Sequence, residues 1–291
     1  MKRMKGLVWL GAASLALALV GCGGGSGGNN NNGGGAVQGP LTFAVNSNNE
    51  LITFQADRPN QPSQPTAITG LQGGERILGI DVRPADGTLY ALGSSSRLYR
   101  INTTSGAATA VGGQFAIPLR GTTFGFDFNP TVDRIRIVSD TDQNLRANPG
   151  TGAIVDGDMN AANGVTEDGT LAYVGGDVAQ GQNPNIAAVA YANNVAGALT
   201  TTLFAIDTTR NTLVKFDSAN AGTLRTVGSL GVDPSSVASF DIQGGTDDAY
   251  AVLRVNGEAA LYKINGTTGA ATRVNRVDTG TSNIVALAVA P

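Results

Sequence analysis

Two 15-residue stretches of the sequence are closely similar: RLYRINTTSGAATAV at residues 97–111 and ALYKINGTTGAATRV at residues 260–274. The pattern L-Y-x-I-N begins at Leu98 in the first stretch and at Leu261 in the second, a constant offset of 163 residues. In both, an alternating apolar and polar segment is followed by a Gly-containing turn and a second alternating segment, which is typical of paired β-strands. The chain therefore contains an internal repeat, from which its fold can be predicted.

Two more alternating segments precede each copy, so the repeating unit has four predicted strands. Two further units with four such segments lie between the copies, and the four units begin near Ile77, Thr123, Ile186 and Val237. No apolar stripe with helical spacing is long enough to predict a helix in this region. Four-stranded units of about 46 to 63 residues are typical of β-propeller blades.

The two ends of the repeat region complement each other. Residues 41–71 supply three predicted strands without an innermost first strand, and residues 283–291, NIVALAVAP, supply a single strand. Pairing them in one blade would close the ring and remove an exposed sheet edge. We therefore predict an all-β fold, a single β-propeller of about five four-stranded blades over residues 41–291. A sixth blade within residues 160–185 and a β-sandwich are the alternatives.

The first 22 residues, MKRMKGLVWLGAASLALALVGC, have the features of a bacterial export signal. A basic start precedes an apolar run, Leu7 to Val20, that is short for a membrane span of about 20 residues. The run ends in LVGC, which resembles the site read by lipoprotein signal peptidase. We therefore expect a signal peptide at residues 1–21 and acylation of Cys22, with a cleaved secretory signal and an incidental cysteine as the alternative.

Residues 22–40 contain a run rich in Gly and Asn that lacks the apolar side chains a packed core needs, and we expect a flexible linker. The lipid would tether a monomeric protein to the bacterial cell envelope. Gly23 stands where an aspartate would resemble an inner-membrane retention signal, which favours the outer membrane.

Composition excludes several classes of function. The chain has no histidine and a single cysteine, which excludes His-based triads, His-ligated zinc and disulfides. Lys2, Arg3 and Lys5 are three of its 19 basic residues, so the part after the signal has 16 basic against 22 acidic residues, a net charge of −6. Such a chain lacks the basic patch that nucleic-acid binding needs. The remaining possibilities are a reaction carried out by carboxylate side chains, or no catalysis at all.

The stretch GFDFNPTVDRIRIVSDTDQNLRANPGTG at residues 125–152, together with LAYVGGDVAQGQNPNIAAVAYANN at residues 171–194, resembles a bacterial family catalogued as domain of unknown function 4394. The similarity extends from about Leu41 to the C-terminus, and the residues around GDMNAANGVTEDG, 157–169, are extra to the family pattern. The resemblance implies a propeller-like fold in an exported protein. The resemblance implies no particular activity and identifies no catalytic residues.

Three aspartates, Asp81, Asp127 and Asp241, occupy corresponding positions in the first strands of their units. First strands line the central channel of a propeller, so these carboxylates can converge there, where they would have raised pKa values or hold a cation. The alternative is structural: they bond to neighbouring backbone groups or cap the turns of the blades. Arg134 and Arg136 on the next strand could also pair with them.

A second candidate site is the loop DGDMNAANGVTE, residues 156–167. It places Asp156, Asp158, Asn160 and Glu167 at positions one, three, five and twelve of a calcium loop like that of an EF-hand. Ala161 stands where such a loop requires glycine and no helices flank it, so an ordinary polar loop is the alternative. The nearby DTDQN, residues 140–144, lacks both the glycine and the final acid, and we interpret it as a hairpin turn.

We therefore predict a membrane-tethered extracytoplasmic lipoprotein whose propeller is a scaffold or binds a protein or glycan partner, without a cofactor other than calcium. The alternative is a calcium-dependent propeller hydrolase of the lactonase-like kind, which requires several carboxylates to meet at one point. A binding role is favoured over an enzyme because the catalytic side chains named above are absent.

Overall fold

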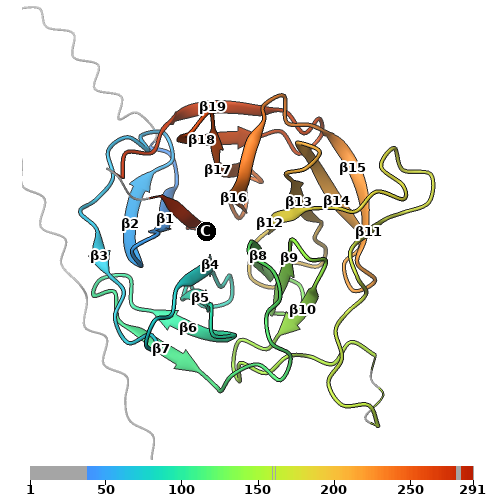
Figure 1. Ribbon diagram of the computed structural model, residues 1–291. Coiled ribbons are helices and arrows are strands. Elements are labelled where there is room, and N and C mark those ends of the chain that lie inside the picture. The colour runs from blue at the N-terminus through green and yellow to red at the C-terminus, as the bar shows by residue number, and fades with distance from the viewer. Residues whose placement is uncertain (1–37, 159, 161, 280–282, 291) are drawn as a thin grey trace, which may run out of the picture. The chain divides into compact units, whose positions relative to one another are not determined.

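The strands of this protein form five small sheets that stand around a common axis, as in a five-bladed β-propeller (Figure 1). The computed structural model describes residues 38–290, except for 159, 161 and 280–282. The expectations for the signal peptide, for Cys22 and for most of the linker concern residues outside this described part. Within it, no helix is long and apolar enough to span a membrane.

Each sheet has one strand at the axis, and the following strands lie progressively closer to the rim (Figure 1). From the axis outward, blade 1 contains β20 (Ile284–Val289), β1 (Leu41–Asn46), β2 (Glu50–Gln55) and β3 (Thr66–Ala67); blade 2 contains β4 (Ile77–Val82), β5 (Leu89–Gly93), β6 (Arg97–Ile101) and β7 (Ala108–Val111). Blade 3 contains β8 (Phe124–Asn129), β9 (Arg134–Ser139) and β10 (Asn144–Ala147); blade 4 contains β12 (Ile186–Tyr191), β13 (Leu203–Asp207), β14 (Thr212–Ser218), β15 (Thr223–Ser229) and β11 (Ala172–Tyr173). Blade 5 contains β16 (Pro234–Ile242), β17 (Ala249–Val255), β18 (Glu258–Ile264) and β19 (Ala271–Arg276).

Blade 1 joins the two ends of the described chain. The inner strand β20 pairs antiparallel with β1, with Phe43 opposite Ala288. Beyond the strands, the Ala290 backbone N–H donates to the Leu41 carbonyl at 2.8 Å. The predicted closure of the ring by N- and C-terminal strands is confirmed, and the five-bladed propeller replaces the six-bladed and sandwich alternatives.

Two blades depart from four strands. The described residues between 160 and 185 form no sixth blade; they supply β11, which pairs parallel with β15 and adds a fifth strand at the rim of blade 4. In blade 3, the fourth strand predicted at residues 153–158 is reduced to one bridge between Ile154 and Ala147. The chain turns away there because the following loop bonds to itself, with the Gly157 N–H donating to the Thr166 carbonyl at 3.1 Å.

The repeated L-Y-x-I-N pattern places the same turn after β6 and after β18. The Oδ1 of Asn102 accepts the backbone N–H groups of the residues two and three positions later, at 3.0 and 2.9 Å. Asn265 makes the same two bonds, both at 2.9 Å. The turns end on Gly106 and Gly269 with φ of 71° and 82°, values that glycine adopts without strain.

The core is divided among the blades. The buried apolar side chains of the described residues form five clusters, and each cluster lies between two neighbouring blades. On β5, for example, Leu89 and Ala91 pack towards blade 1, whereas Tyr90 and Leu92 pack towards blade 3. Burial on both faces explains why β5 is apolar at nearly every position.

Candidate functional site

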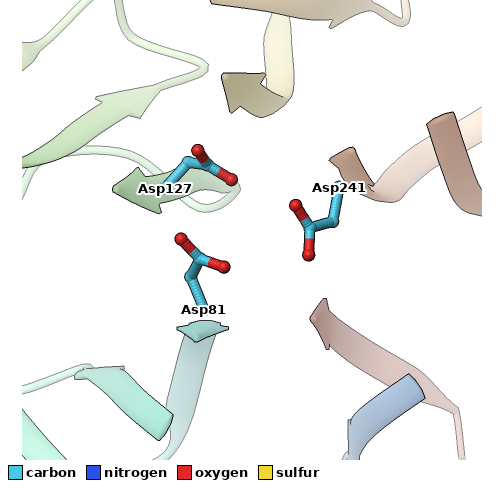
Figure 2. Close-up of side chains that lie close together, drawn as sticks. All are labelled: Asp81, Asp127 and Asp241. Atoms are coloured by element: carbon cyan, nitrogen blue, oxygen red, sulfur yellow. The ribbon is translucent and has the colours of Figure 1, made fainter. Parts of the chain in front are cut away.

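The inner strands bring Asp81, Asp127 and Asp241 together at the propeller axis (Figure 2). They lie on β4, β8 and β16, and we call them the axial aspartates. One carboxylate oxygen from each lies within 4.8 Å of the others, and each residue is only 1% exposed. The convergence arises because the repeat places an aspartate at the same point of three inner strands, although at least 46 residues separate them in sequence.

Each axial aspartate bonds to the inner strand of the next blade around the ring. Asp81 Oδ2 accepts the Phe128 backbone N–H at 2.7 Å, and Asp127 Oδ1 accepts that of Tyr191 at 2.9 Å. Asp241 Oδ2 accepts the Val289 N–H at 2.5 Å. The structural interpretation of these carboxylates, as acceptors for neighbouring backbone groups, therefore describes most of their contacts.

The other two inner strands carry alanine at this position, Ala190 and Ala288. An alanine side chain cannot accept a hydrogen bond, so the inner strand of the blade that follows each alanine has an N–H group without an acceptor on the preceding blade. These are the N–H groups of Val82, which follows Ala288 around the ring, and of Ile242, which follows Ala190. They donate instead to Oδ1 of the aspartate that precedes each of them, Asp81 and Asp241, both at 2.6 Å. The five backbone N–H groups at this depth of the axis, one from each inner strand, therefore all donate to a carboxylate of an axial aspartate; we call them the N–H groups of the layer.

Three carboxylates offer six oxygens, and the five N–H groups use five of them. The remaining oxygen is Asp127 Oδ2, because the N–H of its own next residue, Phe128, already donates to Asp81. Asp127 Oδ2 is buried and accepts no hydrogen bond from the part of the chain that the structure describes. A buried acceptor without a partner costs free energy, so this atom marks the place where a further group would bind.

The electrostatics of the cluster also point to a further group. Burial raises the pKa of Asp81 and of Asp127 well above the ordinary value, and the negative charges of the neighbouring axial aspartates raise it further. Burial raises the pKa of Asp241 to about 7, against the effect of its two backbone hydrogen bonds. Three buried charges at one point are too costly to stay uncompensated, so a proton or a cation must neutralise them in part.

A narrow cavity lies along the axis beside the strand segments that directly precede these carboxylates, although none of the three aspartates lines it. We call it the throat; it has a volume of about 20 Å³ and is lined by residues that directly precede the aspartates, including Ile80, Phe126 and Phe240. It opens into a wider pocket of about 300 Å³, the mouth pocket, with which it shares Leu78 and Phe124. The throat is large enough for about one water molecule, and too small for an organic substrate.

The loop at residues 156–167 does not assemble the predicted calcium ligands in this structure. Asp156 Oδ1 accepts the backbone N–H and the hydroxyl of Thr166, and Asp158 Oδ1 accepts the Asn160 N–H. Glu167 instead bonds to Arg120 and to the Gln143 side chain. Within the described part of the chain, only the axial aspartates form a group of three acidic side chains with oxygens this close.

The segment DTDQN is a hairpin turn between β9 and β10, as expected. The Ser139 N–H donates to the Gln143 carbonyl at 3.1 Å, and Asp142 has a positive φ of 64°. Asp140 accepts the Thr122 backbone N–H at 2.8 Å. Asp140 therefore holds together two loops and is not directed at the axis.

A buried ion pair was missed by the sequence interpretation. One alternative, the pairing of Arg134 and Arg136 with the first-strand aspartates, is wrong: Arg136 bonds to Asp168 at 2.6 Å, and both side chains are at most 2% exposed. Arg146 also bonds to Asp168, at 2.7 Å, while Arg134 donates to backbone carbonyls. Asp168 belongs to the segment extra to the family pattern, where no periodicity indicates what it faces.

The fold and the axial cluster define the class of protein: a five-bladed β-propeller with three buried carboxylates on its axis. The chain belongs to the family described as domain of unknown function (DUF4394), whose model matches residues 50–288. This confirms the resemblance found in the sequence.

Other comparisons give weaker similarities. No curated protein sequence matches the chain significantly. A chain in the crystal structure of a nidogen/laminin complex is 13% identical with a TM-score of 0.49, covering 87% of this chain and 98% of that one. A Bacteroides thetaiotaomicron protein of unknown function is 15% identical with a TM-score of 0.44, covering 82% of this chain and 58% of its own. A Lactobacillus plantarum protein is 16% identical with a TM-score of 0.44, covering 87% and 72%.

Proposed function

We propose that this protein is a membrane-tethered lipoprotein of the bacterial envelope, whose propeller binds a protein or glycan partner at the mouth pocket. The observation that carries this proposal is a pocket of about 300 Å³ at the end of the axis where the inner strands begin. Its lining residues are Asn46, Ser47, Asn49, Arg76, Ile77, Leu78, Thr122, Thr123, Phe124, Ala187 and Val285.

The mouth pocket combines polar, apolar and cationic groups in the way ligand sites do. Arg76 is exposed, and no ion pair found among the described residues involves it. Phe124 offers part of an aromatic ring at the entrance of the throat. A partner with an acidic or strongly polar group beside an apolar surface would fit these side chains.

A binding role is supported over the calcium-dependent hydrolase. The axial aspartates do meet at one point, which that alternative requires. However, the throat has a volume of about 20 Å³, so a substrate cannot reach them from the mouth. None of the described residues that line the mouth pocket is acidic, and the chain has no histidine, so these residues offer no general acid or base where a substrate could bind.

The tether depends on Cys22, at the start of the Gly- and Asn-rich linker. Growth with radiolabelled palmitate should label the full chain, and Cys22→Ala should remove the label and release the protein from membranes. A Cys22→Ala protein that stays labelled and membrane-bound would contradict the tether.

The binding role is tested by photo-crosslinking in cells. A photoreactive amino acid is placed at position 76 in the mouth pocket, and in a matched strain at position 215. Lys215 is an exposed cation on β14 of blade 4 that does not line the mouth pocket. We expect a discrete crosslinked species from position 76 and none from position 215. Equal, diffuse labelling from both positions would overturn the proposal.

A further inference from the structure

We infer that the axial aspartates bind one divalent cation, with calcium as the ion that fits, and that this ion ties the five inner strands together. The inference concerns an ion within the propeller and is independent of the partner at the mouth pocket. Its starting point is the buried oxygen Asp127 Oδ2, which is left without a hydrogen-bond partner after every N–H group of the layer has found an acceptor.

The geometry suits a calcium ion. Oxygens from all three carboxylates lie within 4.8 Å of one another, about twice the 2.3 to 2.6 Å of a calcium–oxygen bond. The carboxylates come from different strands and face the same point (Figure 2). One ion at that point can therefore be reached by all three without a change in the backbone.

The charge of the site favours a cation. None of the ion pairs in the described part of the chain involves an axial aspartate. The five backbone N–H groups that bond to them carry only partial charges. A divalent ion would leave one net negative charge, which those five N–H dipoles can stabilise.

The donor atoms select a hard ion. All available ligands are carboxylate oxygens, and the chain has no histidine that could attract zinc or copper. Calcium tolerates irregular coordination and accepts water ligands, whereas magnesium demands a near-ideal octahedron. The throat lies between the mouth pocket and the residues that directly precede the axial aspartates, and it has space for about one water molecule.

The main competitor for the site is a proton held between Asp127 and a neighbouring axial carboxylate. The substitution Asp127→Asn separates the two cases. An asparagine can still accept the Tyr191 N–H through Oδ1, and its amide NH₂ would occupy the place of Oδ2 as a donor. The variant therefore imitates the protonated acid but removes one ligand of a cation.

The experiment compares the full chain, wild type and Asp127→Asn, after refolding in excess CaCl₂ or in EGTA. The matched control is Asp156→Asn, in the loop predicted from sequence, where the aspartate is half-buried and bonded to Thr166. Melting temperature and calcium content, measured by mass spectrometry after desalting, are the two readouts. Refolding in each buffer ensures that a slowly exchanging buried ion is added or removed.

In wild type and in Asp156→Asn we expect one calcium per chain and a melting temperature about 5 to 10 °C higher at calcium about 100-fold above its Kd. Asp127→Asn should lose both effects. The inference is overturned if wild-type protein holds no calcium and melts at one temperature in both buffers. It is equally overturned if Asp127→Asn keeps the calcium response, or if Asp156→Asn loses it. The wild-type measurements decide the matter even if the axial variant fails to fold.

Discussion

The carboxylate of Asp241, on the inner strand of blade 5, accepts the backbone N–H of Val289 at 2.5 Å. Val289 belongs to β20, the last strand of the chain, which pairs with the first strand, β1. One hydrogen bond near the axis therefore links blade 5 to the blade that joins the two ends. Because Asp241 also accepts the Ile242 N–H at 2.6 Å, a single side chain serves two inner strands.

The substitution Asp241→Ala should destabilise the protein by about 2 to 6 kcal/mol, because two buried N–H groups lose their acceptor at about 1 to 3 kcal/mol each. Urea unfolding at pH 7 measures the change. Asp217→Ala is the control: its side chain is 49% exposed and paired with Arg225, so we expect a change below about 0.5 kcal/mol. Equal stability of the two variants would show that the axial bonds do not hold the ring closed.

Glu75 predicts a dependence of stability on pH. It is 6% exposed and accepts hydrogen bonds from the Ser95 N–H and hydroxyl at 3.0 and 2.6 Å, and from the Tyr99 hydroxyl. Burial acts to raise the pKa of Glu75, but the bonds from Ser95 and Tyr99 outweigh it and lower that pKa below the ordinary value. A lowered folded-state pKa means that the stabilisation is present above the unfolded value of about 4.3 and is lost as the pH falls through the folded value.

The comparison of wild type with Glu75→Gln isolates this contribution. We expect wild type to be the more stable protein at pH 7, and the difference to shrink as the pH is lowered from about 5 to about 3. Urea midpoints at several pH values in this range measure it. A difference that grows towards low pH would have the wrong sign and would refute the assignment.

Much of this fold could be predicted because its signals are local. Alternating segments and the Asn-to-Gly turns, such as Asn102 to Gly106, specify strands and hairpins within a few residues. The convergence of the axial aspartates also followed from the repeat, since equal positions in repeated units lie at equal depths along the axis. The reduction of the fourth strand of blade 3 to a single bridge at Ile154 did not follow from the repeat, because a loop that folds back on itself has no periodic pattern.

What each axial carboxylate bonds to could not be predicted from its own strand. The free oxygen on Asp127 depends on Asp81 in the previous blade, which already serves Phe128. Asp81 also accepts the N–H of Val82, because the preceding blade carries Ala288 at this position and offers no carboxylate acceptor. Such an assignment requires knowing which strands are neighbours in space, and the same holds for the bond of Asp168 to Arg136.

The buried Asp168 should be far more important for stability than its half-buried neighbour Glu167. Asp168→Asn leaves the guanidinium groups of Arg136 and Arg146 without a counter-charge, one of them 2% exposed, which should cost about 3 to 5 kcal/mol. Glu167→Gln, next in sequence, breaks a pair with Arg120, whose side chain is 56% exposed, and should cost about 0 to 1 kcal/mol. Chemical unfolding of both variants tests this, and similar losses would contradict it.

Gly125 allows the inner strands of blades 3 and 4 to approach each other closely. A Cβ at this position would lie 2.8 Å from both the backbone N and the Cγ2 of Val189 on β12. Gly125→Ala should therefore push β8 away from β12 and destabilise the protein by about 1 to 3 kcal/mol. Gly73→Ala is the matched control, because a Cβ there meets no atom within 4 Å and its φ is not in the left-handed region. Thermal or urea unfolding should show the loss only for Gly125→Ala; an unaffected Gly125→Ala protein would mean that the inner strands are less tightly packed than the structure shows.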